Sequence, residues 1–596
     1  MESTNVKTPS QERVWSKYYP EGADFYIPKL KTFELVREFN RNNKDGIALE
    51  YEGREICYGE LFDKVDEKIE FFSSHNVKPD DMVTVTMLMT PEFVYDWYAL
   101  GMLNSVSDLI DPRTSIKGLK KYFDDDESKL ILNTDIFLPS VLKALGDDKS
   151  REIINYNLAN SAERMPLDLG AISKLTGCAS NIISKFDGRV QNFDPNAKFD
   201  GKSATIPEYV KDQALTIVHT GGTTGFPKGV VLTHDNYNAM ALQYMYSQIG
   251  FTEGDRFLLI MPPWISYGSG MLHMSLVTGM KATIISKLDS KKMPYYILRY
   301  QPQWFAGVPK HYCILNDSKK LKKEGTPFLK AGAVGGDAVP AELFMETNKN
   351  MLENGASQGM YPGYAYTEVS SVLAVRQLGP FVPGSVGYPL PNTTVGIFKY
   401  DDVNEVTLDE ELGYGQIGEV CAQTPTMMKG YFKNEEATNE VIRVHKDGNK
   451  WSHSGDLGYL DENGNLFITG RIKEMITRYD GFKIYPNAIE KIINQHPAVD
   501  SCKVVGINDI IHNSGEVPKA YVVFKPGFEK EERSILKTIE GNCFLELPKY
   551  YVENLTFETL SKLPLTPIGK IDYPGLQRLG NLKQSNRKYF TRIRRK

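Results

Sequence analysis

The feature that most constrains the fold is a repeated alternation of short apolar runs with helix-like segments. Each run ends in glycine, proline or polar residues. The runs lie at residues 82–89, 130–132, 215–219, 257–261, 282–285, 304–308 and 331–334. Alternating strands and helices are typical of α/β proteins with parallel sheets. We therefore expect an α/β fold in which ligands bind beyond the carboxyl ends of the strands.

Local signals predict individual elements within this pattern. Two β-like runs on either side of Glu52 and Gly53 predict a hairpin. Thr90 followed by Pro91 predicts the start of a helix, with Thr90 as its cap. The segment 461–465 is typical of a tight turn between two strands.

The last fifth of the chain differs in character from the rest. A basic stretch at 471–483 precedes a helix-like segment at 486–495 and strand-like segments at 502–507 and 519–524. We place a boundary near Gly470, with a large domain at residues 1–469 and a small C-terminal domain at 470–596. The basic tail at 586–596 is interpreted as a solvated end, and contact with a CoA phosphate or with nucleic acid is the alternative.

Composition excludes several classes of protein. The 596 residues include 70 Lys and Arg against 75 Asp and Glu, a balance that argues against a dedicated nucleic-acid binder. No apolar run is long enough for a transmembrane helix, and the polar N-terminus does not resemble a secretory signal. The six cysteines lie far apart and form no CxxC pair, so we expect a reduced, cytoplasmic protein. The nine histidines form no metal-binding motif.

The strongest chemical signal is a Gly- and Thr-rich loop that follows the run at 215–219. The loop reads Thr220-Gly221-Gly222-Thr223-Thr224-Gly225 and leads to Lys228. Glycines allow backbone N–H groups to crowd around an anion, and the hydroxyls and the lysine add donors and charge. The Gly-Lys-Ser/Thr of a Walker A loop is missing, so this is a different phosphate loop. A Gly-rich surface turn is the alternative interpretation.

The loop resembles the phosphate loop of adenylate-forming enzymes, which include acyl-CoA synthetases, luciferases and peptide-synthetase adenylation domains. Four further segments resemble elements of that family in the same order: 363–368, 454–458, 470–474 and 563–571. Ala365 stands where the family has a glycine. Five ordered matches are far more specific than any one of them. The resemblance covers most of the chain, without its first forty residues and its basic tail.

The resemblance implies a fold and a reaction. The large domain would consist of two stacked α/β subdomains and a small β-barrel, and the small α+β C-terminal domain would be mobile. A carboxylate would attack the α-phosphate of ATP, giving an acyl adenylate and pyrophosphate. The thiol of CoA would then take the acyl group and release AMP. ATP, Mg²⁺, CoA and a carboxylic acid are the implied ligands.

The resemblance also implies a role for each matching residue. Thr220 to Lys228 would hold the β- and γ-phosphates, Thr367 the α-phosphate and Glu368 the Mg²⁺ ion. Tyr364 would stack on adenine opposite Gly335, Gly336 and Asp337, and Asp456 with Arg471 would bind the ribose. Lys570 would stabilise charge during adenylation. Considered singly, Lys570 is compatible with a surface lysine, Glu368 with a helix cap and Asp456 with a turn residue.

The substrate side rests on the segment 261–268, which resembles the family's acyl pocket. Amino-acid activators often carry Asp where this chain has Ile265. A buried ammonium needs a carboxylate partner, so Ile265 argues against an α-amino acid and favours a fatty or aromatic acid. The expected pocket residues, each also compatible with a plain core position, are Trp264, Ile265, Tyr267, Phe305 and Gly307.

The second half-reaction is assigned to the C-terminal domain. By resemblance, Lys473 is the hinge about which this domain rotates, and Gly481 approaches the pantetheine thiol. The segment 471–481 is one residue longer than the common family pattern. We therefore assign no role to residues 477–480.

The leading hypothesis is an acyl-CoA synthetase. A related alternative is an adenylation enzyme that loads a carrier protein instead of CoA. A P-loop phosphotransferase is disfavoured by the missing Walker A residues and by the Lys570 motif. A non-catalytic binding protein is disfavoured because every catalytic residue type is present. Release of pyrophosphate separates a ligase from a kinase, and consumption of CoA separates the first two hypotheses.

Overall fold

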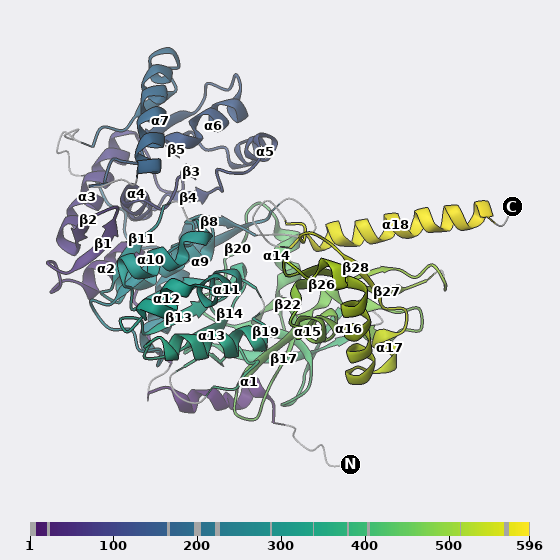
Figure 1. Cartoon of the computed structure of the whole chain (residues 1–596). Coiled ribbons are helices and arrows are strands. Elements are labelled where there is room, and N and C mark those ends of the chain that lie inside the picture. The colour runs from purple at the N-terminus through teal and green to yellow at the C-terminus, as the bar shows by residue number, and fades with distance from the viewer. Residues whose placement is uncertain are drawn as a thin grey trace.

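Two largely parallel sheets form the body of the molecule in the computed structural model (Figure 1). The structure describes residues 7–20, 24–163, 167–195, 204–220, 227–286, 289–337, 339–377, 381–401, 406–512, 514–565 and 571–594. The predicted α/β fold is confirmed. None of the described helices combines the length and apolar character needed to span a bilayer.

The first sheet carries most of the expected ligand-binding strands. Its described strands, in spatial order, are β16 (Tyr388–Pro389), β15 (Ala374–Val375), β14 (Met360–Tyr364), β13 (Ala331–Val334), β12 (Trp304–Gly307), β10 (Arg256–Leu259), β11 (Lys281–Ile284), β1 (Ile47–Tyr51) and β2 (Arg54–Cys57). From β14 to β1 neighbouring strands pair in parallel, so their carboxyl ends share one edge. The predicted hairpin at Glu52 and Gly53 joins β1 to β2.

The second sheet carries the Gly- and Thr-rich loop. Its described strands, in spatial order, are β20 (Gly430–Tyr431), β9 (Gly229–Thr233), β8 (Ala214–His219), β4 (Val106–Leu109), β3 (Met82–Thr86), β5 (Leu130–Thr134), β6 (Glu152–Tyr156) and β7 (Val190–Asn192). Strands β8 to β7 are parallel, whereas β9 returns antiparallel to β8. The loop thus connects two strands that pair antiparallel, β8 and β9.

Helices pack on both sheets, and one large apolar core joins the two. Helices of this core are α2 (Thr32–Phe39), α3 (Tyr58–Ser74), α4 (Pro91–Met102), α8 (His234–Tyr246) and α9 (Ser266–Val277). The outer helices are α5 (Ile116–Asp126), α6 (Leu138–Leu145), α7 (Leu167–Phe186), α10 (Met293–Tyr300), α11 (Pro309–Asn316), α12 (Lys319–Glu324) and α13 (Ala341–Glu353). As predicted, Thr90 caps α4: its Oγ1 accepts a hydrogen bond from the Phe93 backbone N–H at 3.3 Å.

A third, antiparallel sheet stands where the β-barrel was expected. Its path is β18 (Val406–Glu411), β17 (Thr394–Asp401), β19 (Gly418–Gln423), β22 (Lys450–Leu460) and β21 (Ile442–Val444), and β23 (Leu466–Arg471) also pairs with β22. No pairing among the described residues closes these strands into a barrel. The N-terminal α1 (Pro9–Glu12) lies on β17, and the nearby Trp15 is buried in the core of this sheet. Helix α14 (Glu435–Val441) precedes β21.

The C-terminal unit has its own core. It contains β24 (Ile476–Thr477), β25 (Lys483–Ile484), α15 (Pro486–Asn494), β26 (Val499–Asn508), β27 (Glu516–Phe524), α16 (Glu532–Glu546), α17 (Lys549–Val552), β28 (Thr556–Thr559) and α18 (Tyr573–Arg594). Its described core residues begin at Ile476, and no described apolar cluster joins it to the large unit. Figure 1 shows it beside the third sheet, with α18 extending away from the molecule.

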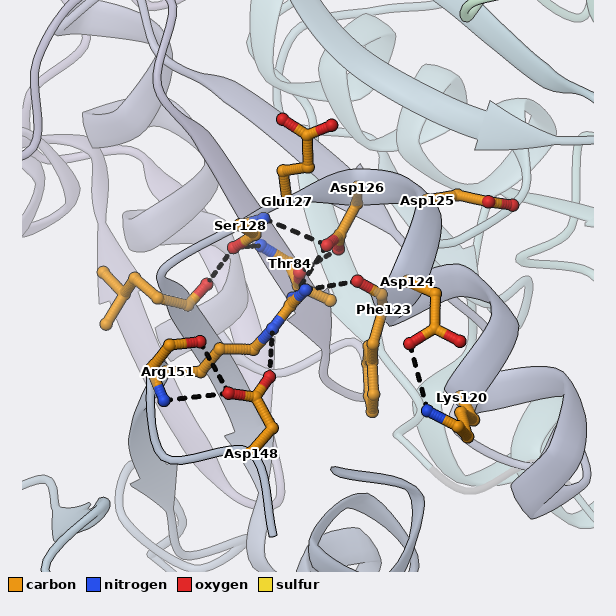
Figure 2. A network of polar contacts seen from close by, with 12 residues as sticks. Thr84, Lys120, Phe123, Asp124, Asp125, Asp126, Glu127, Ser128, Asp148 and Arg151 are labelled. Atoms are coloured by element: carbon orange, nitrogen blue, oxygen red, sulfur yellow. Dashed lines mark hydrogen bonds and ion pairs between the residues drawn. The ribbon is translucent and has the colours of Figure 1, made fainter. Parts of the chain in front are cut away.

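A buried polar network secures the second sheet where α5 ends. Arg151 Nη1 donates to Asp126 Oδ1 at 2.7 Å, and Thr84 on β3 also donates to the Asp126 carboxylate. The Ser128 backbone N–H donates to Asp126 Oδ1 at 3.0 Å. Figure 2 shows these side chains converging on Asp126, which is 4% exposed. The network is structural, because it ties the end of α5 to β3 and to the residue that precedes β6.

Candidate active site

Several of the expected site residues lie at the carboxyl edge of the first sheet. Neighbouring parallel strands β14, β13 and β12 end at Tyr364, Val334 and Gly307, and β10 leads into the segment 261–268. Gly335, Gly336 and Asp337 follow β13 directly. Their placement follows from the topology, because consecutive β–α units bring loops distant in sequence to one edge.

Tyr364 forms the centre of the part of the site where the nucleoside is expected. Its hydroxyl donates to Asp456 Oδ2 at 2.7 Å, and Arg471 Nε lies 3.0 Å from Asp456 Oδ1. Burial and then the Asp456 carboxylate raise the pKa of Tyr364, which therefore stays protonated and donates. Burial raises the pKa of the Asp456 carboxyl, and the Arg471 guanidinium opposes that shift. The structure thus unites the expected adenine- and ribose-binding side chains.

A turn within β22 positions Asp456. The sequence located this turn at Gly455 but did not reveal what supports it. Gly455 has φ of +70°, and its N–H donates to Glu419 Oε1 at 2.8 Å. His453 Nδ1 donates to the other carboxylate oxygen of Glu419 at 2.8 Å. Burial alone would raise the pKa of the Glu419 carboxyl, but the hydrogen bond from His453 and its charge lower it. Glu419 is therefore an ionised support for the turn that carries Asp456.

Glu419, Cys421 and His453 are also the group of metal-capable side chains found among the described residues. Their ligand atoms lie within 4.8 Å of one another, and all three residues are buried. Glu419 is engaged by His453, Gly455 and Thr407, so its oxygens serve hydrogen bonds within the sheet. We interpret the group as the structural support of the turn.

The phosphate loop is connected to the predicted metal-binding carboxylate by an aromatic residue that the sequence did not reveal. Lys228 Nζ lies 4.8 Å above the centre of the Tyr431 ring. The Tyr431 hydroxyl donates to Glu368 Oε1 at 2.5 Å. Burial and then Glu368 raise the pKa of Tyr431, so it too remains a donor. Tyr431 lies on β20, far from both partners in sequence, and no local motif marks it.

The ends of the loop form a closed hairpin. The Thr220 N–H donates to the Lys228 carbonyl at 2.9 Å, and the Lys228 N–H donates to Thr220 Oγ1 at 3.1 Å. The predicted phosphate ligands Gly221, Gly222, Thr223, Thr224 and Gly225 lie outside the described residues. Thr367 and Glu368 lie together in a short 3-10 helix, Thr367–Val369, directly after β14.

The acyl-pocket segment lies against this site. Trp264 is 6% exposed, and Ile265 and Tyr267 pack between two apolar clusters. A Cβ built on Gly335 would lie 4.0 Å from the Tyr267 hydroxyl. Tyr267 therefore joins the expected acyl pocket to the expected adenine wall.

Two of the expected pocket residues point elsewhere. Phe305 stacks on Tyr312, with ring centres 5.3 Å apart, in the core beneath α10 and α11. A Cβ built on Gly307 would lie 3.1 Å from His311 Nδ1 and would thus meet α11. Strand alternation explains both positions, because residues 305 and 307 share the face opposite to that of Trp304.

The residues expected to act in the second half-reaction lie in or beside the C-terminal unit. Lys473 is exposed in a 3-10 helix, Ile472–Glu474, that directly follows β23. Gly481 has φ of +84°, and a Cβ there would have no neighbour within 4 Å. Lys570 lies outside the described residues.

Comparison with known proteins identifies the family. Residues 36–432 match the family model described as AMP-binding enzyme, and residues 488–570 match that of the AMP-binding enzyme C-terminal domain. The chain belongs to the AMP-binding enzyme family. The resemblance to adenylate-forming enzymes is thereby confirmed, and the protein is an enzyme of the acid–thiol ligase class.

Relatives of this AMP-binding enzyme include two ligases from Bacillus. A long-chain-fatty-acid–CoA ligase of Bacillus subtilis (strain 168) is 26% identical over 94% of this chain and 97% of its own length. A 2-succinylbenzoate–CoA ligase of Bacillus mycoides (strain KBAB4) is 29% identical over 87% and 96%, respectively.

Solved structures share the fold. An anthranilate CoA ligase in complex with anthranoyl-AMP has a TM-score of 0.77 at 18% identity, over 95% of this chain and 100% of that chain. An O-succinylbenzoate coenzyme A synthetase from Bacillus subtilis, bound to ATP and a magnesium ion, has a TM-score of 0.68 at 23% identity, over 91% and 98%.

Proposed function

We propose that this enzyme is an AMP-forming acyl-CoA synthetase that activates an apolar carboxylic acid, fatty or aromatic. The observation that carries the proposal is the convergence of two polar groups beside an apolar acyl segment. One group comprises Tyr364, Asp456 and Arg471, and the other comprises Glu368, Tyr431 and Lys228. The CoA ligase relatives, which match nearly the whole chain, support CoA rather than a carrier protein as acceptor.

The nucleoside group would bind AMP through side chains that are already oriented. Each Asp456 oxygen has two lone pairs, so the carboxylate can accept ribose hydroxyls besides its bonds to Tyr364 and Arg471. The hydrogen bond to Asp456 would restrain the Tyr364 ring, on which adenine would stack opposite Gly335 and Gly336. The absence of a Cβ at these glycines leaves room for the base.

The polyphosphate group would neutralise charge during adenylation. One carboxylate oxygen of the acid attacks the α-phosphorus, and the bond to the bridging oxygen of pyrophosphate breaks. Lys228 and the loop amides would hold the leaving pyrophosphate, and Thr367 and Lys570 would contact the α-phosphate. The Glu368 carboxylate, held by Tyr431, is a hard oxygen ligand that suits Mg²⁺, which when bound would neutralise phosphate charge.

The residues around the expected acyl pocket favour an apolar monocarboxylic acid as substrate. Arg113 lies 5.0 Å from the Trp264 ring, but its guanidinium donates to both oxygens of Asp111 at 2.9 and 2.7 Å. This local pairing neutralises the cation, so it adds no net charge to attract a second carboxylate. Ile265 likewise offers no partner for an ammonium group.

A screen of carboxylic acids with ATP, Mg²⁺ and CoA tests the proposal. We expect acid-dependent release of pyrophosphate and AMP together with a thioester, strongest for fatty or aromatic acids. Omission of CoA should leave ATP–pyrophosphate exchange intact. Formation of ADP, or transfer only to a phosphopantetheinyl carrier, would contradict the proposal.

A further inference from the structure

Helix α7 presents three of its large apolar side chains to solvent. Leu175 is 73% exposed, Ile182 59% and Phe186 88%. Intervals of seven and four residues place these side chains on one helix face. The same face also carries the exposed residues Ala171, Cys178 and Ala179. We call these six residues the α7 stripe.

The opposite face of α7 combines small polar residues, which are hydrogen-bonded within the protein, with Ile183, which packs against the apolar cluster of α5 and α6. Ser173 Oγ donates to Asn157 Oδ1 at 2.6 Å, and Thr176 Oγ1 donates to Asp135 Oδ2 at 2.8 Å. Ser173 and Ser180 are each 4% exposed. A surface helix normally buries its apolar face, whereas α7 leaves three large apolar side chains exposed. Because the inner face of α7 holds the helix on the protein, the α7 stripe is free to contact a binding partner.

The position of α7 limits what can cover it. The helix connects β6 to the edge strand β7 and stands at the top of the molecule, away from the C-terminal unit (Figure 1). Its large exposed side chains supply on the order of a few hundred Å² of apolar area. A stable protein interface needs about 800 Å² from each partner. A single projecting helix of this area suits a soft planar surface better than a second copy of the chain.

The charge of α7 identifies the kind of surface. Helix α7 contains Lys174 and Lys185 and one acidic residue, Asp168 in its first turn, so its net charge is +1. Helical geometry places both exposed lysines along the same border of the stripe. Asp187, which follows the helix, is paired with Arg189 at 2.7 Å. Lysines at the border of an apolar face extend their ammonium groups toward anionic headgroups while the apolar side chains enter the membrane.

We propose that the α7 stripe docks this enzyme onto an anionic phospholipid membrane, with the helix in the plane of the headgroups. Leu175, Ile182 and Phe186 insert among the acyl chains, and Lys174 and Lys185 contact the phosphates. The proposal does not rest on the acyl-CoA synthetase reaction, because binding is measured without ATP, acid or CoA.

Co-sedimentation with vesicles tests the proposal. The probes are phosphatidylcholine vesicles with and without phosphatidylserine. The full-length enzyme should bind the phosphatidylserine vesicles more tightly. A triple variant, Leu175→Gln with Ile182→Gln and Phe186→Gln, should lower the partition coefficient at least about tenfold, because these side chains carry the insertion. A double variant, Lys174→Gln with Lys185→Gln, should lose most of the preference for phosphatidylserine.

A matched control removes equally exposed apolar side chains elsewhere. Ile511 is 67% exposed and Leu545 86%, and both lie in the C-terminal unit. Ile511→Gln with Leu545→Gln should leave vesicle binding unchanged. Unchanged thermal melting of every variant shows that folding is intact. A fluorophore on Cys178, with the other exposed thiol removed by Cys313→Ser, should shift to the blue on addition of vesicles.

Three outcomes would overturn the proposal. The first is an enzyme that binds neither type of vesicle. The second is a stripe triple variant that binds as well as the unchanged enzyme. The third is a dimer in vesicle-free solution that the triple variant abolishes, since a second copy would then occupy the stripe.

Discussion

At the scale of single residues, the site depends on tyrosines that orient carboxylates. Tyr364 holds Asp456, and Tyr431 holds Glu368. In both pairs burial, and then the neighbouring carboxylate, raises the pKa of the phenol, so the tyrosine remains a donor at physiological pH. Each carboxylate is thereby restrained before a nucleotide arrives, which reduces the ordering that binding must impose.

The metal role of Glu368 can be tested through the magnesium requirement. Glu368→Gln keeps the shape of the side chain but removes a negative oxygen ligand. We expect the Mg²⁺ concentration for half-maximal ATP–pyrophosphate exchange to rise at least about tenfold, because Mg²⁺ prefers anionic oxygen. Tyr431→Phe should cause a smaller rise. Glu436→Gln, at an exposed site on α14, serves as the control, and an unchanged titration for Glu368→Gln would contradict the assignment.

His273 is expected to make the large unit sensitive to acid. Its Nδ1 faces the Tyr98 hydroxyl at 3.0 Å and its Nε2 faces Asn238 Oδ1 at 3.1 Å, so the buried ring is satisfied in its neutral form. Burial and then His234 lower the pKa of His273 to about 3. Unfolding restores the ordinary value of about 6.5. Below that pH the unfolded chain takes up a proton that the folded chain does not.

The free energy of unfolding should therefore fall as the pH drops from about 6.5 toward 3. The expected slope is about 1.4 kcal/mol per pH unit for each histidine of this kind. His273→Gln, which does not titrate, should reduce the slope by that amount in urea unfolding measured at neutral and mildly acidic pH. Equal slopes for His273→Gln and the unchanged enzyme would refute the assignment.

At the scale of elements, the edge of the first sheet depends on a glycine whose backbone lies close to the backbone of the neighbouring strand. Gly387 precedes β16 with φ of +91°, and a Cβ there would lie 2.2 Å from the carbonyl carbon of Val375 on β15. Gly384, three residues earlier, has φ of +89° but no neighbour within 4 Å. Both glycines have a positive φ that strains any other residue. They differ in whether a Cβ would collide with a neighbouring strand.

Substitution by alanine separates these two effects. Gly384→Ala should cost about 1 kcal/mol for its left-handed backbone. Gly387→Ala should cost at least about 3 kcal/mol, because β15 and β16 must also separate. Since β15 pairs with β14, it should also weaken AMP binding through Tyr364. Thermal melting and AMP titration provide the measurements, and equal melting temperatures for the two variants would contradict the steric argument.

The network in Figure 2 gives a second element-scale prediction. The Arg151 side chain is 8% exposed and that of Asp126 1%. Arg151→Ala would leave a buried carboxylate without its main partner and should cost about 3–5 kcal/mol. Arg41→Ala, which removes an exposed pair with Glu38, should cost no more than about 1 kcal/mol. Denaturant unfolding compares the two, and a similar loss for both would rule out a structural role for Asp126.

At the scale of the whole molecule, two units with separate cores meet through a short connection. The described core of the C-terminal unit begins at Ile476, and the Arg471 guanidinium just before it contacts Asp456 in the large unit. Among the described residues beyond this connection, Asn487 Nδ2 donates to the Thr469 carbonyl at 3.2 Å. We propose that the C-terminal unit rotates about Lys473 between the half-reactions. The two units can move as rigid bodies because no described apolar cluster spans both of them.

Separate assays of the half-reactions test this rotation. Lys570→Ala should slow adenylate formation by roughly 10²–10³-fold, the scale for losing one charge-stabilising donor. It should largely spare thioester formation from added acyl adenylate. Lys473→Pro fits the 3-10 backbone of the present state and should hinder rotation away from it. It should spare ATP–pyrophosphate exchange and impair thioester formation, as should Gly481→Leu.

The controls for this prediction address folding. Gly481 has positive φ, so any side chain there is strained even though space is open. Gly481→Ala carries the same strain with a smaller side chain, and comparison of its melting temperature with that of Gly481→Leu isolates the effect of size. A well-folded Lys473→Pro enzyme in which both half-reactions decline together would contradict domain rotation.

The sequence by itself determined the fold class, the family and many element boundaries. Short apolar runs became buried parallel strands, because a strand covered on both faces must be apolar along its whole length. Thr90 caps α4 and the Glu52–Gly53 turn joins β1 to β2, because both depend on neighbouring residues alone. The ordered motifs identified the AMP-binding enzyme family for the same reason: each can be recognised within a few consecutive residues.

Only the tertiary structure decided which side chains face one another. Tyr431 meets Glu368 and Lys228 because β20 pairs with β9, and no local sequence pattern encodes that pairing. Phe305 faces α11 because strand register, not hydrophobicity, selects the side of a sheet. The expected barrel is an antiparallel sheet because closure requires a pairing between distant edges. The orientation of α7 was likewise decided by tertiary contacts. Its apolar stripe faces outward because Ser173 and Thr176 form hydrogen bonds with residues inside the fold.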